Sequence, residues 1–197
     1  MLEETQQYKE RLVARWETAE GRAMLQNVLT ALRSMQPWAS YLNNLPDVED
    51  VENGRDLRGA PLAGVDLRGA SLRNTRFTFV DFRGALLEAM DFRGSDLAHA
   101  DFQGADLSNA NFEGCLMPRS NLRQANLSGA RLVAAVLAGS NLVGANFSNA
   151  NLTNSTLFGA KTEGAIFEGA ILNNTRFGTF AEEPQQGTNE EPGREGL

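Results

Sequence analysis

The sequence predicts an all-β solenoid with an α-helical segment at its N-terminus, and three observations carry that prediction. First, every fifth residue from Leu57 to Phe177 except Thr162 is large and apolar, and 23 of these 25 positions hold Leu or Phe. Second, a small residue usually stands two positions before each apolar centre, and Gly or Asn often stands two positions after it. Third, apolar residues within 1–45 recur at spacings of three and four, which is typical of an amphipathic helix.

The five-residue period excludes a helix and a flat strand for this stretch. On a helix, five residues turn the side-chain direction by about 500°, so the leucines would spiral around the axis and form no stripe. On a continuous strand, successive centres would point to opposite faces, which the intervening Asp, Asn and Arg residues do not allow. The remaining solution is a short extended segment followed by a bend at the Gly/Asn position, so that the chain coils around its own apolar side chains.

The residues of this repeat carry a family resemblance. The segment from Ala100 to Gly114, ADFQGADLSNANFEG, resembles the consensus of the pentapeptide-repeat family. The resemblance implies a right-handed quadrilateral β-helix with four repeats, or 20 residues, in each coil. Residues 55–180 would then form a β-helix of about six coils, in which residues 20 positions apart stack on one another.

The flanking segments have a different composition. We expect a short helical head or cap over 1–45, with a break near Gly21, followed by an acidic linker over 46–54 and a disordered acidic tail over 181–197. A helical head could cover the open edge of the first coil, or it could dock a partner protein. Both interpretations of the head remain open at this point.

The sequence contains few candidates for chemistry. The single histidine, His99, is expected at an outward corner, and the single cysteine, Cys115, is expected inside among alanines. Asp81 and Asp101 lie one coil apart, but we expect the aspartates to bind corner amides or to pair with Arg58, Arg68, Arg73, Arg83 and Arg93. No phosphate loop, metal cluster or nucleophile triad is recognisable, so the expected protein is not an enzyme and has no catalytic residue, metal or cofactor.

The charge distribution limits the function. The formal net charge is −7, yet residues 55–179 contain 12 basic and 11 acidic residues, so the acidity lies in the head, linker and tail. Direct nucleic-acid binding is not expected, and neither a secretory signal nor a membrane span is present, so a cytoplasmic protein is the default. Some pentapeptide-repeat proteins protect DNA gyrase by resembling duplex DNA with an acidic rod. The near-neutral repeat region makes that role the alternative rather than the first hypothesis.

Two surfaces are candidates for protein contacts. Outward apolar residues gather in the C-terminal half of the repeats and form a candidate protein-binding patch: Leu116, Pro118, Val133, Val136, Ala138, Val143 and Phe158. The last coil has no following helix to cover it, so it is a candidate self-association end, with Ile166, Ile171, Phe177 and Phe180. The sequence therefore predicts a non-enzymatic scaffold that binds a protein partner of unknown identity and forms a homodimer.

Overall fold

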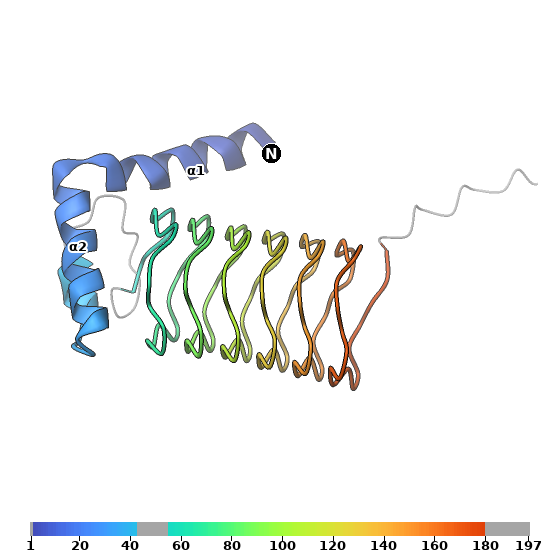
Figure 1. The fold of residues 1–197 in the computed structure, drawn as a ribbon. Coiled ribbons are helices and arrows are strands. Elements are labelled where there is room, and N and C mark those ends of the chain that lie inside the picture. The colour runs from blue at the N-terminus through green and yellow to red at the C-terminus, as the bar shows by residue number, and fades with distance from the viewer. Residues whose placement is uncertain (1, 43–54, 180–197) are drawn as a thin grey trace, which may run out of the picture.

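The computed structural model describes residues 2–42 and 55–179. Two helices and a short 3-10 helix precede a regular coiled rod (Figure 1). The expected acidic linker, the tail and Phe180 lie outside the described residues.

The N-terminal segment forms α1 (Leu2–Glu17), α2 (Ala19–Arg33) and the 3-10 helix η1 (Ala39–Leu42). The expected break near Gly21 is three residues too late, because Thr18 is the residue that ends α1 and caps α2. The Thr18 hydroxyl accepts a hydrogen bond from the Gly21 amide at 2.9 Å, which satisfies one of the free amides at the start of α2. Gly21 has another role: a Cβ there would lie 2.1 Å from the Arg15 carbonyl oxygen, so only glycine allows this close approach. Neither α1 nor α2 is long and apolar enough to cross a membrane.

Residues 55–179 form the coiled rod that the repeat predicts. Parallel bridges join residues 20 positions apart from Asp56↔Arg76 to Thr156↔Arg176, which confirms four repeats per coil. In each repeat the residue before the apolar centre forms the parallel bridge and the chain then turns, so the strands are extremely short. The backbone pairing is nevertheless continuous, as in the 2.7 Å hydrogen bond from the Phe102 amide to the Asn121 carbonyl.

The rod has four faces, which we name after their first apolar centre: the Leu57, Leu62, Leu67 and Leu72 faces. The centres are buried from Leu57 to Leu157, as expected for inward ladders. Phenylalanine rings stack one coil apart, with centroids 5.2 Å apart for Phe82 and Phe102 and 5.0 Å apart for Phe92 and Phe112. In the last described coil Thr162 and Phe167 are half-buried and Leu172 and Phe177 are exposed, and the described residues contain no further coil that would cover them.

The corners adopt the left-handed backbone that the Gly/Asn position predicts. Several other residues also adopt it, including Phe79 with φ 61° and His99 with φ 57°. These two lie in one corner column with Gly59 and Arg119, each 20 residues from the next. A bulky residue in this conformation is unfavourable by itself, so a compensating contact is expected there.

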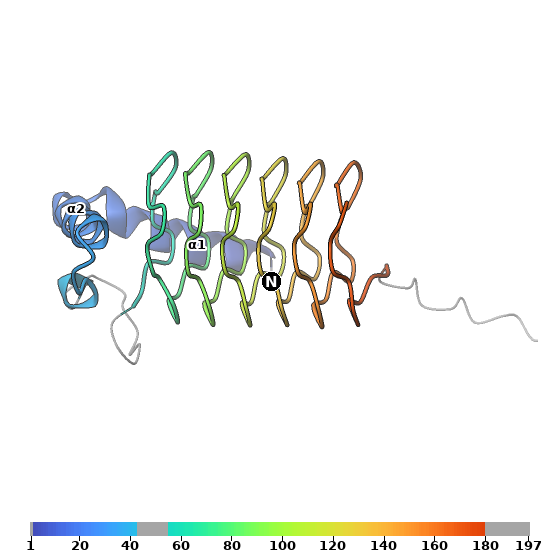
Figure 2. The same ribbon diagram turned by 60° about the horizontal axis from the view of Figure 1, so that its bottom comes forward.

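The two helices occupy different sides of the rod. α2 lies across the end of the first coil, and α1 runs along the rod from that end over the following coils (Figures 1 and 2). Buried α2 residues such as Val28 and Leu32 belong to the same apolar cluster as Leu57 and Leu62. Thus α2 covers the apolar end of the solenoid, and α1 contacts its side.

Candidate interaction surfaces

The structure gathers five of the seven patch residues on one face. Leu116 and Val136 are bridged neighbours in one column of the Leu57 face, and three others lie in the column on the far side of the buried centres: Pro118, Ala138 and Phe158. Leu116 is 50% exposed and Phe158 is 37% exposed, whereas Val136, Pro118 and Ala138 are half-buried. Val133 lies on the Leu72 face and Val143 on the Leu62 face, so these two do not share a surface with the other five.

The C-terminal end of the rod presents apolar side chains and backbone donors together. Phe177 is 49% exposed and Leu172 is 38% exposed, and Ile166 and Ile171 are also exposed. Amide groups at apolar centres donate to the following coil throughout the rod, but within the described residues the amides of Thr162, Phe167 and Leu172 have no backbone acceptor. Among the described residues, this end therefore combines an apolar surface with backbone donors that have no partner coil.

A buried ionic cluster fixes the junction between α1 and the first coil. The Arg15 guanidinium donates to both Asp56 carboxylate oxygens, at 2.9 and 3.2 Å, and Arg58 also binds this carboxylate, at 2.7 Å. Trp16 adds a hydrogen bond from its indole Nε1 to the Arg58 carbonyl at 2.8 Å. Burial alone would raise the pKa of Asp56, but hydrogen bonds from Arg58 and Arg15 outweigh it and lower the pKa to about 2.

The other aspartates have the structural roles that the sequence predicts. Asp81 pairs with Arg83 at 2.6 Å, and Asp91 pairs with Arg93 at 2.8 Å. Asp101 has no arginine in its own repeat, and its Oδ1 accepts from the Gln103 amide at 3.0 Å. These carboxylates bind the corner backbone or a neighbouring arginine, so they are not a pair poised for acid–base chemistry. Within residues 2–42 and 55–179, no three His, Cys, Asp or Glu side chains lie together as metal ligands would.

Cys115 is buried, as expected, and its thiol donates to the Phe92 carbonyl at 3.0 Å. Burial raises the pKa of this thiol to about 12, so the reactive thiolate is suppressed at neutral pH.

His99 lies in a more enclosed place than an outward corner suggests. It is half-buried, and its imidazole stacks on Phe79 with ring centroids 4.9 Å apart. Burial, reinforced by the Arg119 charge, lowers the pKa of His99, and Lys9 acts in the same direction. Asp96 acts in the opposite direction, but it does not outweigh the other contributions.

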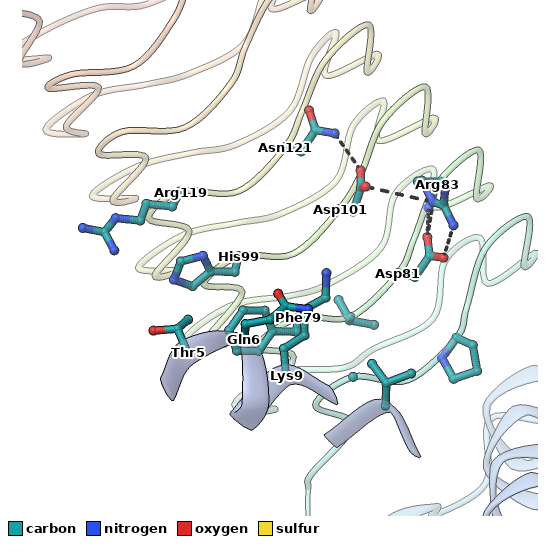
Figure 3. A pocket seen from close by; sticks show the side chains of 14 residues that line it. Thr5, Gln6, Lys9, Phe79, Asp81, Arg83, His99, Asp101, Arg119 and Asn121 are labelled. Carbon is teal, nitrogen blue, oxygen red and sulfur yellow. Dashed lines mark hydrogen bonds and ion pairs between the residues drawn. The ribbon is translucent and has the colours of Figure 1, made fainter. Parts of the chain in front are cut away.

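His99 belongs to a cleft of about 630 Å³ between α1 and the rod, which the sequence analysis missed (Figure 3). Thr5, Gln6, Lys9 and Val13 of α1 form one wall, and the other wall belongs to the Leu62 face. The corner column with Phe79, His99 and Arg119 forms the floor. A sequence signal for this cleft exists, since these three bulky residues replace glycine in successive coils of one column.

The family model described as pentapeptide repeats matches eight copies over 56–88, 76–114, 115–154 and 150–178, which together span more than half of the chain. No curated protein sequence matches the chain.

Among solved structures, the chain is similar to HetL, a pentapeptide repeat protein involved in heterocyst differentiation regulation from the cyanobacterium Nostoc sp. strain PCC 7120. The identity is 31% and the TM-score is 0.59, over 61% of this chain and 56% of HetL. A pentapeptide repeat protein from the Arabidopsis thaliana thylakoid lumen is 31% identical, with a TM-score of 0.39, over 46% of this chain and 66% of that one. QnrB1, a plasmid-mediated fluoroquinolone resistance protein, is 27% identical, with a TM-score of 0.42, over 57% of each chain.

Proposed function

Because the chain belongs to the pentapeptide-repeat family, we propose that it is a non-enzymatic cytoplasmic scaffold whose rigid rod presents a surface for protein–protein interaction. The observation that carries this proposal is the apolar patch on the Leu57 face. Exposed apolar side chains that gather on one face are typical of interaction sites. A filled rod with stacked coils also holds such a surface at fixed spacing without rearrangement on binding.

We further propose that the chain self-associates through the C-terminal end of the rod. The apolar side chains of Leu172 and Phe177 and the open backbone edge lie at this end. A second copy that meets this end would bury the apolar surface and satisfy the exposed donors.

The patch is tested by capture of partner proteins from the lysate of the native host, followed by mass spectrometry. The test variant carries Val136→Glu and Phe158→Glu, which place two charges on the Leu57 face. The matched control carries Gln124→Glu and Ser128→Glu, at the Leu67 face opposite the patch and at the corner that leads to it, where neither side chain has a carboxylate one coil away. A partner retained by the wild type and the control, and lost by the test variant, supports the scaffold function and places its surface.

Two other outcomes of the capture experiment would contradict the proposal. A partner held equally by all three proteins contradicts the patch as the binding surface. Capture of DNA gyrase subunits by all three, together with protection of supercoiling against a fluoroquinolone, would replace the scaffold function by gyrase protection.

A further inference from the structure

We propose that the cleft between α1 and the Leu62 face binds an extended peptide segment of a partner protein that carries acidic side chains next to apolar ones. The residues that line this site are not those of the patch or of the C-terminal end, although Arg119 directly follows Pro118 of the patch, and the proposal does not depend on either surface.

The shape of the cleft favours a peptide over a small molecule. The cleft is only partly enclosed, whereas small-molecule sites enclose most of their ligand. Its floor runs through Phe79, His99 and Arg119, which lie at the same corner of three consecutive coils. At about 4.8 Å per coil, this floor is about 10 Å long, which corresponds to about three residues of extended chain.

The charges of the cleft select an acidic ligand. The carboxylates of Asp81 and Asp101 are already engaged, because Asp81 binds Arg83 and Asp101 accepts a hydrogen bond from the side-chain Nδ2 of Asn121 at 2.9 Å (Figure 3). Lys9 and Arg119 have no ion-pair partner within the part of the chain that the structure describes. The positive charge of the cleft is therefore the part that is available to a ligand.

The apolar part of the cleft lies beside these cations. Val13, Pro61 and Val80 line the end towards the first coil, and the stacked rings of Phe79 and His99 lie between this end and Arg119. A ligand that only supplied a negative charge would leave this apolar surface unused. A peptide with alternating acidic and apolar residues matches both parts, since the side chains of an extended chain alternate in direction.

The single histidine gives a direct test, because its imidazole resonances in a proton NMR spectrum of the full chain belong to His99 alone. The probe is a hexapeptide of alternating glutamate and leucine with blocked ends. The comparison ligands are the corresponding lysine–leucine hexapeptide and inorganic phosphate. We expect the glutamate peptide to shift the His99 resonances in a saturable manner and to raise its pKa, because a carboxylate would arrive beside the imidazole.

Variants distinguish this site from general charge attraction. Lys9→Ala combined with Arg119→Ala should weaken binding of the glutamate peptide at least about 10-fold, the effect of losing charge-assisted hydrogen bonds. Arg123→Ala is the matched control, because Arg123 is an exposed cation of the Leu62 face that does not line the cleft. It should leave the affinity within about 2-fold of the wild type. The Val136→Glu, Phe158→Glu variant should also retain binding, so failure of the patch and failure of the cleft are distinguishable.

Three results would overturn the proposal: no saturable shift with the glutamate peptide, an equal shift with the lysine peptide, or an equal shift with phosphate. The third result would assign the cleft to a small anion instead of a peptide.

Discussion

At the residue scale, burial determines how much an Asp–Arg pair contributes to the stability of the fold. Asp56–Arg58 and Asp66–Arg68 are the same pair in different repeats, with Arg Nη2 at 2.7 and 2.8 Å from the carboxylate. The Asp66 pair is exposed, and such pairs contribute little to stability. The Asp56 pair is buried beneath α1 and is completed by Arg15, so removal of its carboxylate leaves two buried cations without their anion.

Asp56→Asn should therefore destabilise the protein by about 3–5 kcal/mol at neutral pH, which urea unfolding followed by circular dichroism would measure. Asp66→Asn is the control and should change the unfolding midpoint far less. Equal midpoints for the two variants would contradict a stabilising role for the buried cluster.

The same carboxylate predicts an acid dependence. The pKa of Asp56 falls from 3.8 to about 2 on folding, so its stabilising contribution is present above about pH 4 and is lost as the pH falls through 2. The shift corresponds to about 2 kcal/mol. The stability difference between the wild type and Asp56→Asn should shrink over this pH range, and a difference that is constant from pH 5 to pH 2 would count against it.

Cys115 gives a further residue-scale prediction. Because burial suppresses its thiolate, the native protein should not react measurably with a disulfide reagent such as Ellman's reagent at neutral pH. One thiol per chain should react after denaturation. Rapid reaction of the folded protein would show that the coil around Cys115 opens more readily than its packing indicates.

At the element scale, the pitch of α1 nearly matches the spacing of the coils. One helical turn rises 5.4 Å and one coil about 4.8 Å, so residues one turn apart meet successive corners. The Tyr8 ring meets Phe79 with centroids 6.2 Å apart, and the Leu12 backbone lies over Gly59. This match allows α1 to lie along the rod. In the first coil the corner residue under α1 is Gly59, whereas in the second coil it is Phe79, whose ring contacts Tyr8.

Gly59 is the tightest point of this contact, because a Cβ there would lie 2.9 Å from the Leu12 backbone. Gly64 has the same left-handed conformation but nothing within 4 Å of the corresponding position. Gly64→Ala should cost about 1–2 kcal/mol from backbone strain alone. Gly59→Ala should cost at least about 1 kcal/mol more and should speed amide hydrogen exchange in α1. Similar costs and unchanged exchange would mean that α1 does not depend on this contact.

At the scale of the whole molecule, the two ends of the rod differ. At the first coil, α2 covers the apolar core, whereas the last described coil leaves Leu172 and Phe177 exposed. An end-to-end contact at the last coil would therefore give a closed dimer rather than a filament, since α2 occupies the opposite end.

Light scattering over a concentration series should accordingly give a mass near twice the 21.4 kDa of one chain. Leu172→Glu combined with Phe177→Glu should give the monomer mass, because charges at the end oppose burial of that surface. Asn173→Glu adds a charge to the outward side of the same coil and should leave the dimer intact. A monomer at all concentrations for the wild type would remove the self-association proposal.

The sequence by itself determined the repeating part of this protein. The five-residue repeat places each apolar centre inside the rod, and the 20-residue coil places each residue above its equivalent in the previous coil. The inward position of Cys115 and the outward position of the aspartates therefore follow from their place in the repeat. Local rules were sufficient there because every repeat meets the same neighbours.

Only the tertiary structure decided the contacts between unlike elements. The Arg15–Asp56 pair joins residues 41 positions apart, and α1 converts the corner of His99 into the floor of a cleft. Neither contact recurs with the five-residue repeat, because each depends on where α1 lies on the rod. The same reason explains why the helix break was expected at Gly21: glycine there serves the packing of α2 against the end of α1, while Thr18 provides the cap.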